Sequence, residues 1–186
     1  MIVSKVGEEF EHGQSHFNFS PEHVRASVER SLKRLRTDYI DVVLVHSDGN
    51  DMAIIEQTGT LDMLADLKKK GLIRATGMST KTVEGGLATL ARADIAMVTY
   101  QLGYDEELPV IEHAAAHNKG ILIKKAFASG HLSQNIADPV QASLDYILGT
   151  PGVSSVIAGT INPLHLRENV KKARLAVGSQ PLTVCR

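Results

Sequence analysis

The chain has 186 residues, of which 43% are hydrophobic and 22% are charged, and its formal net charge is −1 at pH 7. This length is enough for one domain with a sizeable core, and the composition argues against a disordered chain. The small net charge gives no overall field toward nucleic acid or an acidic membrane, and no apolar run approaches the ~18 residues of a membrane helix.

Short aliphatic or β-branched runs alternate with longer segments of helical periodicity. In chain order, the runs predict strands at residues 2–6, 39–46, 73–79, 95–100, 121–123 and 153–158. A helix is predicted after each strand, at residues 21–35, 61–70, 81–91, 109–117, 139–148 and 163–173. The stretch 13–20, rich in glycine, histidine and asparagine, is predicted to be the longest loop. Because parallel strands need helical crossovers, this alternation predicts an α/β fold with a parallel sheet.

Two architectures fit this order of elements. One is an open doubly wound sheet, but no Gly-x-Gly-x-x-Gly follows any predicted strand, so its dinucleotide fingerprint is absent. The other is a (β/α)8 TIM-type barrel, which needs eight units and about 250 residues. At roughly 30 residues per strand–helix unit, this chain supplies only six units, which predicts an incomplete barrel.

Polar residues recur where the predicted aliphatic strands finish. His46 follows the run VVLV directly, and other strands are followed by Lys5, by Ser79 and Thr80, and by Gln101. In both architectures the carboxyl ends of the strands carry the active site, so His46 is predicted to face a pocket. The alternative is a histidine that only hydrogen-bonds a neighbouring loop.

Five stretches, in order along the chain, carry a resemblance to one family. They are SKVG (4–7), SLKRLRTDYIDVVLVHSDG (31–49), IRATGMST (73–80), TYQLGY (99–104) and GVSSVIAGTINPLHLRENV (152–170). The chain resembles the aldo-keto reductases, NADP(H)-dependent enzymes with a (β/α)8 barrel that transfer hydride to an aldehyde or ketone. The resemblance implies that residues 1–186 form a single aldo-keto-reductase-like barrel domain, with a small carbonyl compound as substrate.

The resemblance also assigns roles to single residues. Lys5 matches the lysine that lowers the pKa of the family's catalytic tyrosine, and His46 matches the histidine that orients the carbonyl group. Both roles make physical sense, because a nearby ammonium favours a phenolate and a histidine can stabilise charge on a carbonyl oxygen. The positions implied to bind the cofactor are Ser79, Thr80, Gln101, Lys124, Phe127, Ser129, Gly159, Thr160, Asn162, His165, Glu168 and Asn169.

The predicted cofactor-binding residues have a physical rationale of their own, and they depart from the family pattern in two places. Asn162 and Pro163 open a helix whose free N–H groups favour an anion such as the 2′-phosphoribose, although Asn-Pro also starts helices that bind nothing. His165 stands where many members carry arginine, so NAD(H) remains an alternative to NADP(H). Lys124 takes the place of the usual ring-stacking tyrosine, and Lys125 takes that of the following serine.

The family's catalytic aspartate and tyrosine have no counterpart in this sequence. They normally precede the lysine strand, and the sequence begins at that strand. We expect N-terminal truncation by two βα units; closure of the barrel by self-association through its open edges and a partial barrel are alternatives. None of the four tyrosines, Tyr39, Tyr100, Tyr104 and Tyr146, is predicted to replace the missing acid.

Other functions therefore stay open at this point. One is a catalytically inactive, nucleotide-binding regulatory subunit or an inactive fragment, and another is an unrelated barrel enzyme such as a lyase. His113 and His117 are one helical turn apart, a spacing that can bind a metal, but no third ligand is evident and no metal is expected. The single cysteine, Cys185, excludes an internal disulfide, and the first thirty residues lack a signal-like apolar core. A cytoplasmic protein without nucleic-acid or membrane partners is expected.

Overall fold

The structure is a computed structural model that describes residues 1–130 and 135–178, without the side chain of Ser129. Cys185 and the rest of 179–186 lie outside the described residues. The chain forms two compact units, Met1–Val98 (unit 1) and Thr99–Arg186 (unit 2), and each is described by itself.

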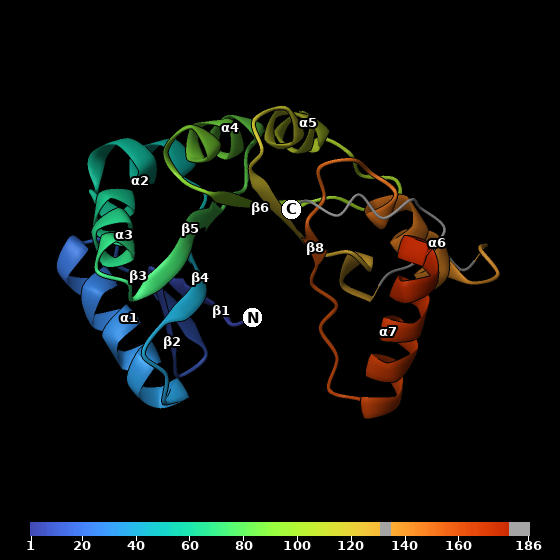
Figure 1. Cartoon of the computed structure of the whole chain (residues 1–186), viewed down its shortest axis with the longest axis horizontal. Helices are drawn as coiled ribbons and strands as arrows, with labels where there is room; N and C mark the ends of the chain where they lie inside the picture. The colour runs from blue at the N-terminus through green and yellow to red at the C-terminus, as the bar shows by residue number, and fades with distance from the viewer. Residues whose placement is uncertain (131–134, 179–186) are drawn as a thin grey trace. The chain divides into compact units, whose positions relative to one another are not determined.

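Unit 1 is built on parallel strands. In spatial order these are β1 (Val3–Val6), β4 (Ile40–His46), β5 (Ile73–Ser79) and β6 (Ile95–Thr99). Its helices are α1 (Pro21–Leu35), α2 (Asp51–Gln57), α3 (Thr60–Lys69) and α4 (Val83–Arg92). Figure 1 shows α1 and α3 on the same face of β4 and β5.

The core of unit 1 lies between these strands and helices. From the strands it takes Val6, Val43, Val45 and Met78, all at most 2% exposed. The helices contribute buried residues at helical spacing, namely Val24, Val28, Leu61, Leu64 and Leu67. Because successive strand residues point to opposite faces, the residues that alternate with these valines point away from the helices.

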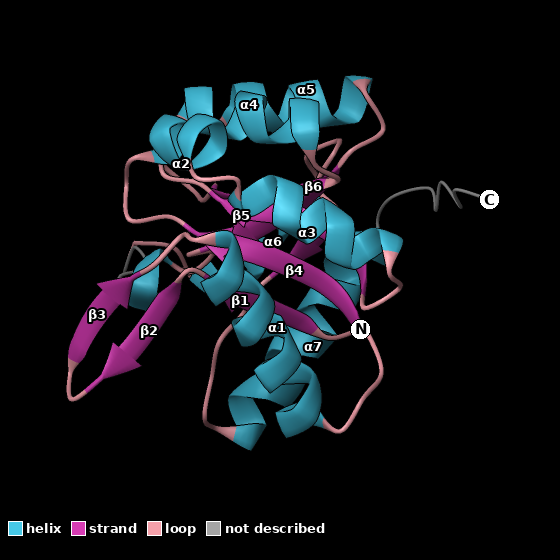
Figure 2. Cartoon of the chain, turned by 90° about the vertical axis from the view of Figure 1, so that its left-hand side faces the viewer, coloured by secondary structure: helices cyan, strands magenta, loops and turns pink. Residues whose placement is uncertain are grey.

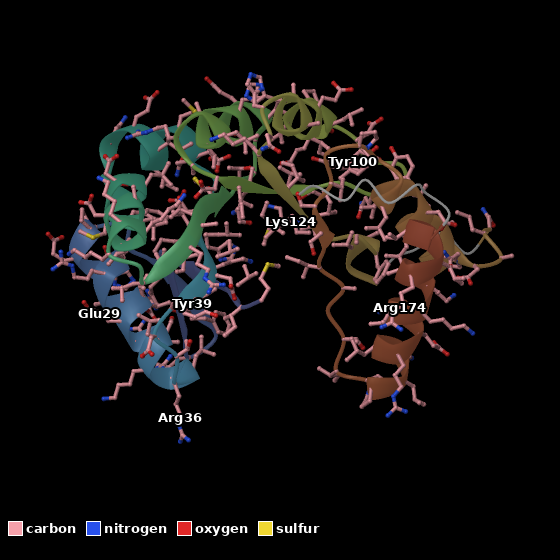
Figure 3. The ribbon with its side chains drawn as sticks, viewed as in Figure 1. Glu29, Arg36, Tyr39, Tyr100, Lys124 and Arg174 are labelled. Carbon is pink, nitrogen blue, oxygen red and sulfur yellow. The ribbon has the colours of Figure 1, made fainter. Side chains whose placement is uncertain are left out.

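The start and end of α1 follow the local sequence. The Ser20 hydroxyl accepts a hydrogen bond from the His23 N–H at 3.3 Å, and Pro21 occupies the first helical turn, where its missing N–H costs nothing. At the other end Arg36 adopts a left-handed conformation with φ 53°, and its side chain extends away from the molecule (Figure 3).

One expectation about unit 1 is wrong. The stretch 13–20 is not a single loop, because β2 (Glu8–Glu11) and β3 (Gln14–Phe17) form an antiparallel hairpin. Figure 2 shows this two-stranded ribbon standing apart from the larger sheet. His12 and Gly13 form its two-residue turn with positive φ angles of 51° and 81°, the backbone geometry that suits the twist of a hairpin.

Unit 2 contains a short parallel pair, β7 (Gly120–Lys124) and β8 (Ser155–Val156). Its helices are α5 (Leu108–Ala116), the 3-10 turn η1 (Ala128–Gly130), α6 (Pro139–Leu148) and α7 (Pro163–Gly178). Ile121 and Ile123 of β7 are fully buried, as are Ile111 of α5 and Ile147 of α6. Each of the six predicted strands is present, although β8 is only two residues long, and α2 was not predicted.

Parallel strands joined by helices occur in both units, so the predicted α/β class is confirmed. No helix in the described part of the chain combines the length and the hydropathy that crossing a bilayer requires.

Candidate active site

Three predicted residues lie on one face and at one end of the sheet in unit 1. Lys5 of β1 pairs in register with Leu44 of β4, and His46 of β4 pairs with Ser79 of β5. All three alternate with the core valines and Met78, so they point away from α1 and α3. Since the strands are parallel, Lys5, His46 and Ser79 come together at their carboxyl ends.

These residues differ in exposure. Lys5 is exposed, the side chain of His46 is 33% exposed, and Ser79 and Thr80 are buried. Nδ1 of His46 contacts a carboxylate oxygen of Glu8, the first residue of the hairpin. Glu8 therefore joins this edge of the sheet, although sequence reasoning gave it no role.

A buried carboxylate fixes the loops that follow His46 and Thr80. Asp51, 2% exposed, accepts a hydrogen bond at Oδ1 from the Ser47 hydroxyl. At Oδ2 it accepts from the backbone N–H groups of Lys81 (2.9 Å) and Thr82 (2.8 Å) and from the Thr82 hydroxyl (2.7 Å). The loops after β4 and β5 are thereby tied to each other. We refer to Asp51 with these partners as the Asp51 clamp.

The clamp explains why α4 carries a glycine at position 85. A Cβ added at Gly85 would lie 2.3 Å from the Cβ of Asp51 and 2.4 Å from its Oδ2. Such distances are far inside van der Waals contact, so the close approach of α4 to Asp51 requires glycine here.

Unit 2 gathers six predicted residues around one pocket of about 310 Å³. The six are Phe127, Gly159, Thr160, His165, Glu168 and Asn169, and Gly130 and Val140 also line it. Gly159 and Thr160 follow β8, whereas His165, Glu168 and Asn169 lie on the first turns of α7. The pocket therefore forms where a parallel strand leads into a helix N-terminus, an arrangement suited to anions.

At the start of α7, the side-chain oxygens of Thr160 and Asn162 accept hydrogen bonds from nearby backbone N–H groups. The Thr160 hydroxyl oxygen accepts from the Asn162 N–H at 3.1 Å, and Asn162 Oδ1 accepts from the Leu164 N–H at 2.9 Å. The hydroxyl proton of Thr160 and the amide protons of Asn162 are therefore the groups suited to an external acceptor, such as a phosphate or ribose oxygen.

Four further predicted positions of unit 2 remain, and three of them, Lys124, Asn162 and Gln101, lie outside the lining of that pocket. Lys124 ends β7, and its half-buried side chain is labelled in Figure 3. Asn162 caps α7, as described above. Gln101 follows β6 and forms a two-residue bridge with Tyr104 through backbone hydrogen bonds of 2.9 and 3.1 Å. Ser129 lies in η1, and its side chain is outside the described part of the chain.

The side chain of Gln101 carries a buried polar atom. Its Oε1 is buried and accepts no hydrogen bond from any residue that the structure describes. A buried carbonyl oxygen left without a donor carries a free-energy cost, and an external N–H group would remove it.

Two tyrosines of unit 2, Tyr104 and Tyr146, have raised pKa values and do not suit proton transfer at neutral pH. Tyr146 stacks on Tyr100 with ring centroids 5.0 Å apart, and the hydrogen bond to Tyr100, together with burial, raises the pKa of Tyr146 to about 12. Burial and the hydrogen bond that Tyr104 donates to Glu106 raise the pKa of Tyr104 as well. A phenol that exchanges its proton in catalysis needs a shift in the opposite direction.

The pair His113 and His117 is stacked with ring centroids 4.0 Å apart, and His117 Nδ1 bonds the backbone carbonyl of His113 at 2.8 Å. Within residues 1–130 and 135–178 there is no group of three or more His, Cys, Asp or Glu residues that could hold a metal ion.

A sequence model of the Aldo/keto reductase family matches residues 1–139. The chain belongs to the aldo/keto reductase family.

Individual relatives agree with this assignment. A solved structure of an aldo-keto reductase from Pseudomonas aeruginosa is 58% identical, with a TM-score of 0.87, and the match covers 95% of this chain and 66% of that one. The oxidoreductase YqkF of Bacillus subtilis is 26% identical over 93% of this chain and 68% of its own length. Methylglyoxal reductase DkgB of Salmonella typhimurium is 30% identical over 86% of this chain and 62% of its own.

This aldo/keto reductase chain thus spans between 62% and 68% of the length of these three relatives. The structural match confirms the predicted fold, an α/β chain that carries six of the eight βα units of the barrel.

Sequence reasoning missed Glu8 and Asp51. Asp51 had a weak signal, because Asp51, Ile54 and Ile55 have the spacing of a short helix, but its partners Lys81 and Thr82 lie about thirty residues further on. Glu8 had none, since a glutamate after a strand is usually a solvated residue.

Proposed function

We propose that this chain carries the cofactor pocket and the lysine–histidine pair of a carbonyl reductase that uses NADP(H) or NAD(H). The proposed substrate is a small aldehyde or ketone. One observation carries the proposal: six residues that the resemblance assigns to the cofactor line a single pocket between β8 and the first turns of α7. The name of one relative, methylglyoxal reductase DkgB, is consistent with a small carbonyl substrate.

The residues present fit such a nucleotide. The N-terminal turns of α7 favour an anionic phosphate, and Thr160 and Asn162 can donate to phosphate or ribose oxygens. Oε1 of Gln101, which has no donor among the described residues, is suited to the amide N–H of a nicotinamide carboxamide. His165 lacks the fixed fork of an arginine, so its position is compatible with either NADP(H) or NAD(H).

The chemistry divides between cofactor and chain. When bound, the nicotinamide cofactor supplies or accepts the hydride. His46 would polarise the carbonyl oxygen through a ring nitrogen, and Lys5 would favour the anionic form of a nearby phenol. This sequence lacks the family's tyrosine and aspartate, and Tyr104 and Tyr146 have raised pKa values. We therefore expect the 186-residue chain to bind nucleotide and to turn over generic aldehydes slowly or not at all.

The test is a titration of the purified 186-residue chain with NADPH and NADH, followed by cofactor fluorescence and by a thermal melt. Saturable binding with a raised melting temperature is expected. His165→Ala should weaken binding roughly three- to tenfold, which is the loss of about one hydrogen bond.

Arg167→Ala is the matched control, because Arg167 is also a basic, exposed residue of α7 but is absent from the pocket lining. A chain that melts cooperatively and binds neither cofactor would contradict the proposal. Equal weakening by both substitutions would contradict the assignment of the pocket.

A further inference from the structure

Glu8 lies between the hairpin and the end of β4. It begins β2, where it pairs in register with Phe17 of β3, and its side chain is only 22% exposed. One carboxylate oxygen, Oε1, accepts a hydrogen bond from the Ser15 hydroxyl at 2.5 Å. The other, Oε2, contacts Nδ1 of His46.

The carboxylate is held in its ionised form. The hydrogen bond from Ser15 lowers the pKa of Glu8, the charges of His46 and Lys5 lower it further, and the opposing effect of burial is smaller than their sum. An ionised carboxylate has no proton to donate and acts only as an acceptor. The ring nitrogen that faces Glu8 must therefore carry the proton of the Glu8–His46 contact.

The hairpin that carries Glu8 has anchors of its own. Glu9, the next residue, forms an ion pair with Arg30 of α1 and lies 3.5 Å from a ring nitrogen of His23. At the base of the hairpin the Asn18 N–H donates to the Gly7 carbonyl at 2.9 Å. Glu8 is thus positioned by contacts that do not involve His46, and it can act as a fixed support for the imidazole.

We propose that Glu8 is a positioning residue for His46, which holds the imidazole with its proton on Nδ1 and directs Nε2 to the substrate carbonyl. The second half of this statement rests on the proposed function of His46. A carboxylate acceptor at Nδ1 keeps that proton in both charge states of the ring. The proton that the ring gains or loses is then the one on Nε2, so the protonated ring is the form that donates a hydrogen bond from Nε2 to the carbonyl oxygen.

Nitrogen NMR of the full 186-residue chain tests the proposal without cofactor or turnover. The ring nitrogens of His46 are assigned by the resonances that disappear in His46→Gln. In the unsubstituted chain at neutral pH, Nδ1 is expected at the position of a protonated ring nitrogen. In Glu8→Ala it should move downfield toward the position of an unprotonated nitrogen. Glu8→Gln keeps one acceptor oxygen and should shift it less.

Glu9→Gln is the matched control. It removes a carboxylate from the same hairpin, where Glu9 contacts Arg30 and not His46, so the His46 tautomer should not change. A thermal melt identifies any variant that fails to fold. If Glu8→Ala fails to fold, the isosteric Glu8→Gln still provides the test.

Two results would overturn the proposal: an unprotonated Nδ1 in the unsubstituted chain, or a tautomer that stays the same in Glu8→Ala and Glu8→Gln. Nucleotide titration of the same samples separates this outcome from a failure of the proposed function. Glu8 lies in unit 1 and the nucleotide pocket lies in unit 2. Loss of nucleotide binding would count against the pocket, and the ring-nitrogen result would still decide the role of Glu8.

Discussion

The two candidate sites are held in different ways. In unit 1 the proposed catalytic edge, which carries Lys5 and His46, depends on buried groups: Ser79 and Asp51 are each 2% exposed, and Asp51 ties together the loops that follow β4 and β5. In unit 2 the proposed nucleotide pocket is formed by one short strand end and the first turns of α7, where His165 and Glu168 are exposed. Substitutions at the first site should therefore destabilise the fold of unit 1. Substitutions at the second site should change its affinity for nucleotide and leave the fold intact.

The largest effect is expected from breaking the Asp51 clamp. Asp51→Ala leaves the Lys81 and Thr82 N–H groups and two hydroxyls without their buried acceptor. We expect the free energy of unfolding to fall by about 3 kcal/mol, measured by urea denaturation. Asp66→Ala removes an exposed carboxylate paired with Lys69 at 3.0 Å and should cost under about 0.5 kcal/mol. Equal denaturation midpoints would show that the clamp does not stabilise unit 1.

The second-largest effect is expected at the proposed nucleotide pocket, where a substitution should strengthen the binding of one cofactor and leave the stability of the fold unchanged. His165→Arg introduces a fork of charged donors on the pocket wall and should favour NADPH over NADH by roughly tenfold, or about 1.4 kcal/mol. The melting temperature without cofactor should stay unchanged, because residue 165 is exposed.

Leu164→Arg is the control for the added charge, since Leu164 is 63% exposed and is not part of the pocket lining. It should leave the ratio of the two affinities as it was. An unchanged ratio in His165→Arg would show that this side chain does not reach the 2′ position of the nucleotide.

The smallest effect concerns acid stability in unit 1. Burial raises the pKa of Asp94, but the hydrogen bonds from Lys68 (2.7 Å) and the Thr76 N–H (2.9 Å) outweigh it, so the pKa lies below its usual value. A lowered pKa means that this stability is fully present above about pH 4 and is lost as pH falls through the native value. Because Asp94 is partly exposed, Asp94→Asn should cost only about 1 kcal/mol at pH 7.

The difference in the free energy of unfolding between Asp94→Asn and the unsubstituted chain should shrink on acidification, as measured by urea denaturation at a series of pH values. Asp62→Asn is the comparison, since its carboxylate pairs with Arg92 at 72% exposure and should contribute a few tenths of a kcal/mol. A difference that stays constant down to pH 2 would rule out a role for Asp94 ionisation.

Local sequence predicted most of the fold. The run VVLV before His46 is buried on both faces of β4, as a continuous aliphatic strand should be in a parallel sheet. The start of α1 was readable because Ser20 and Pro21 act within one turn. Five of the residues predicted within 152–170 line one pocket, and they were predicted together because they come from one contiguous segment with a family resemblance.

Long-range contacts could not be predicted. The hairpin was missed because Glu8–Glu11 and Gln14–Phe17 contain no β-branched residue, and only His12-Gly13 marked its turn. Glu8 and Asp51 gain their roles from partners that the fold brings near. The linear sequence does not show that Glu8 contacts His46, which is 38 positions away. It also does not show that Asp51 accepts a hydrogen bond from Thr82.

The close approach of α4 to Asp51 has a consequence for protein engineering. The lack of a side chain at Gly85 makes room for the Asp51 carboxylate, which hydrogen-bonds the segment after His46. Residues 47–51 and 81–85 therefore need to be exchanged together. A chimaera that exchanges the loop after β4 with that of a relative must carry the loop after β5 and the glycine of α4 with it. Grafting either loop alone would place a side chain against the carboxylate or leave the carboxylate without its donors.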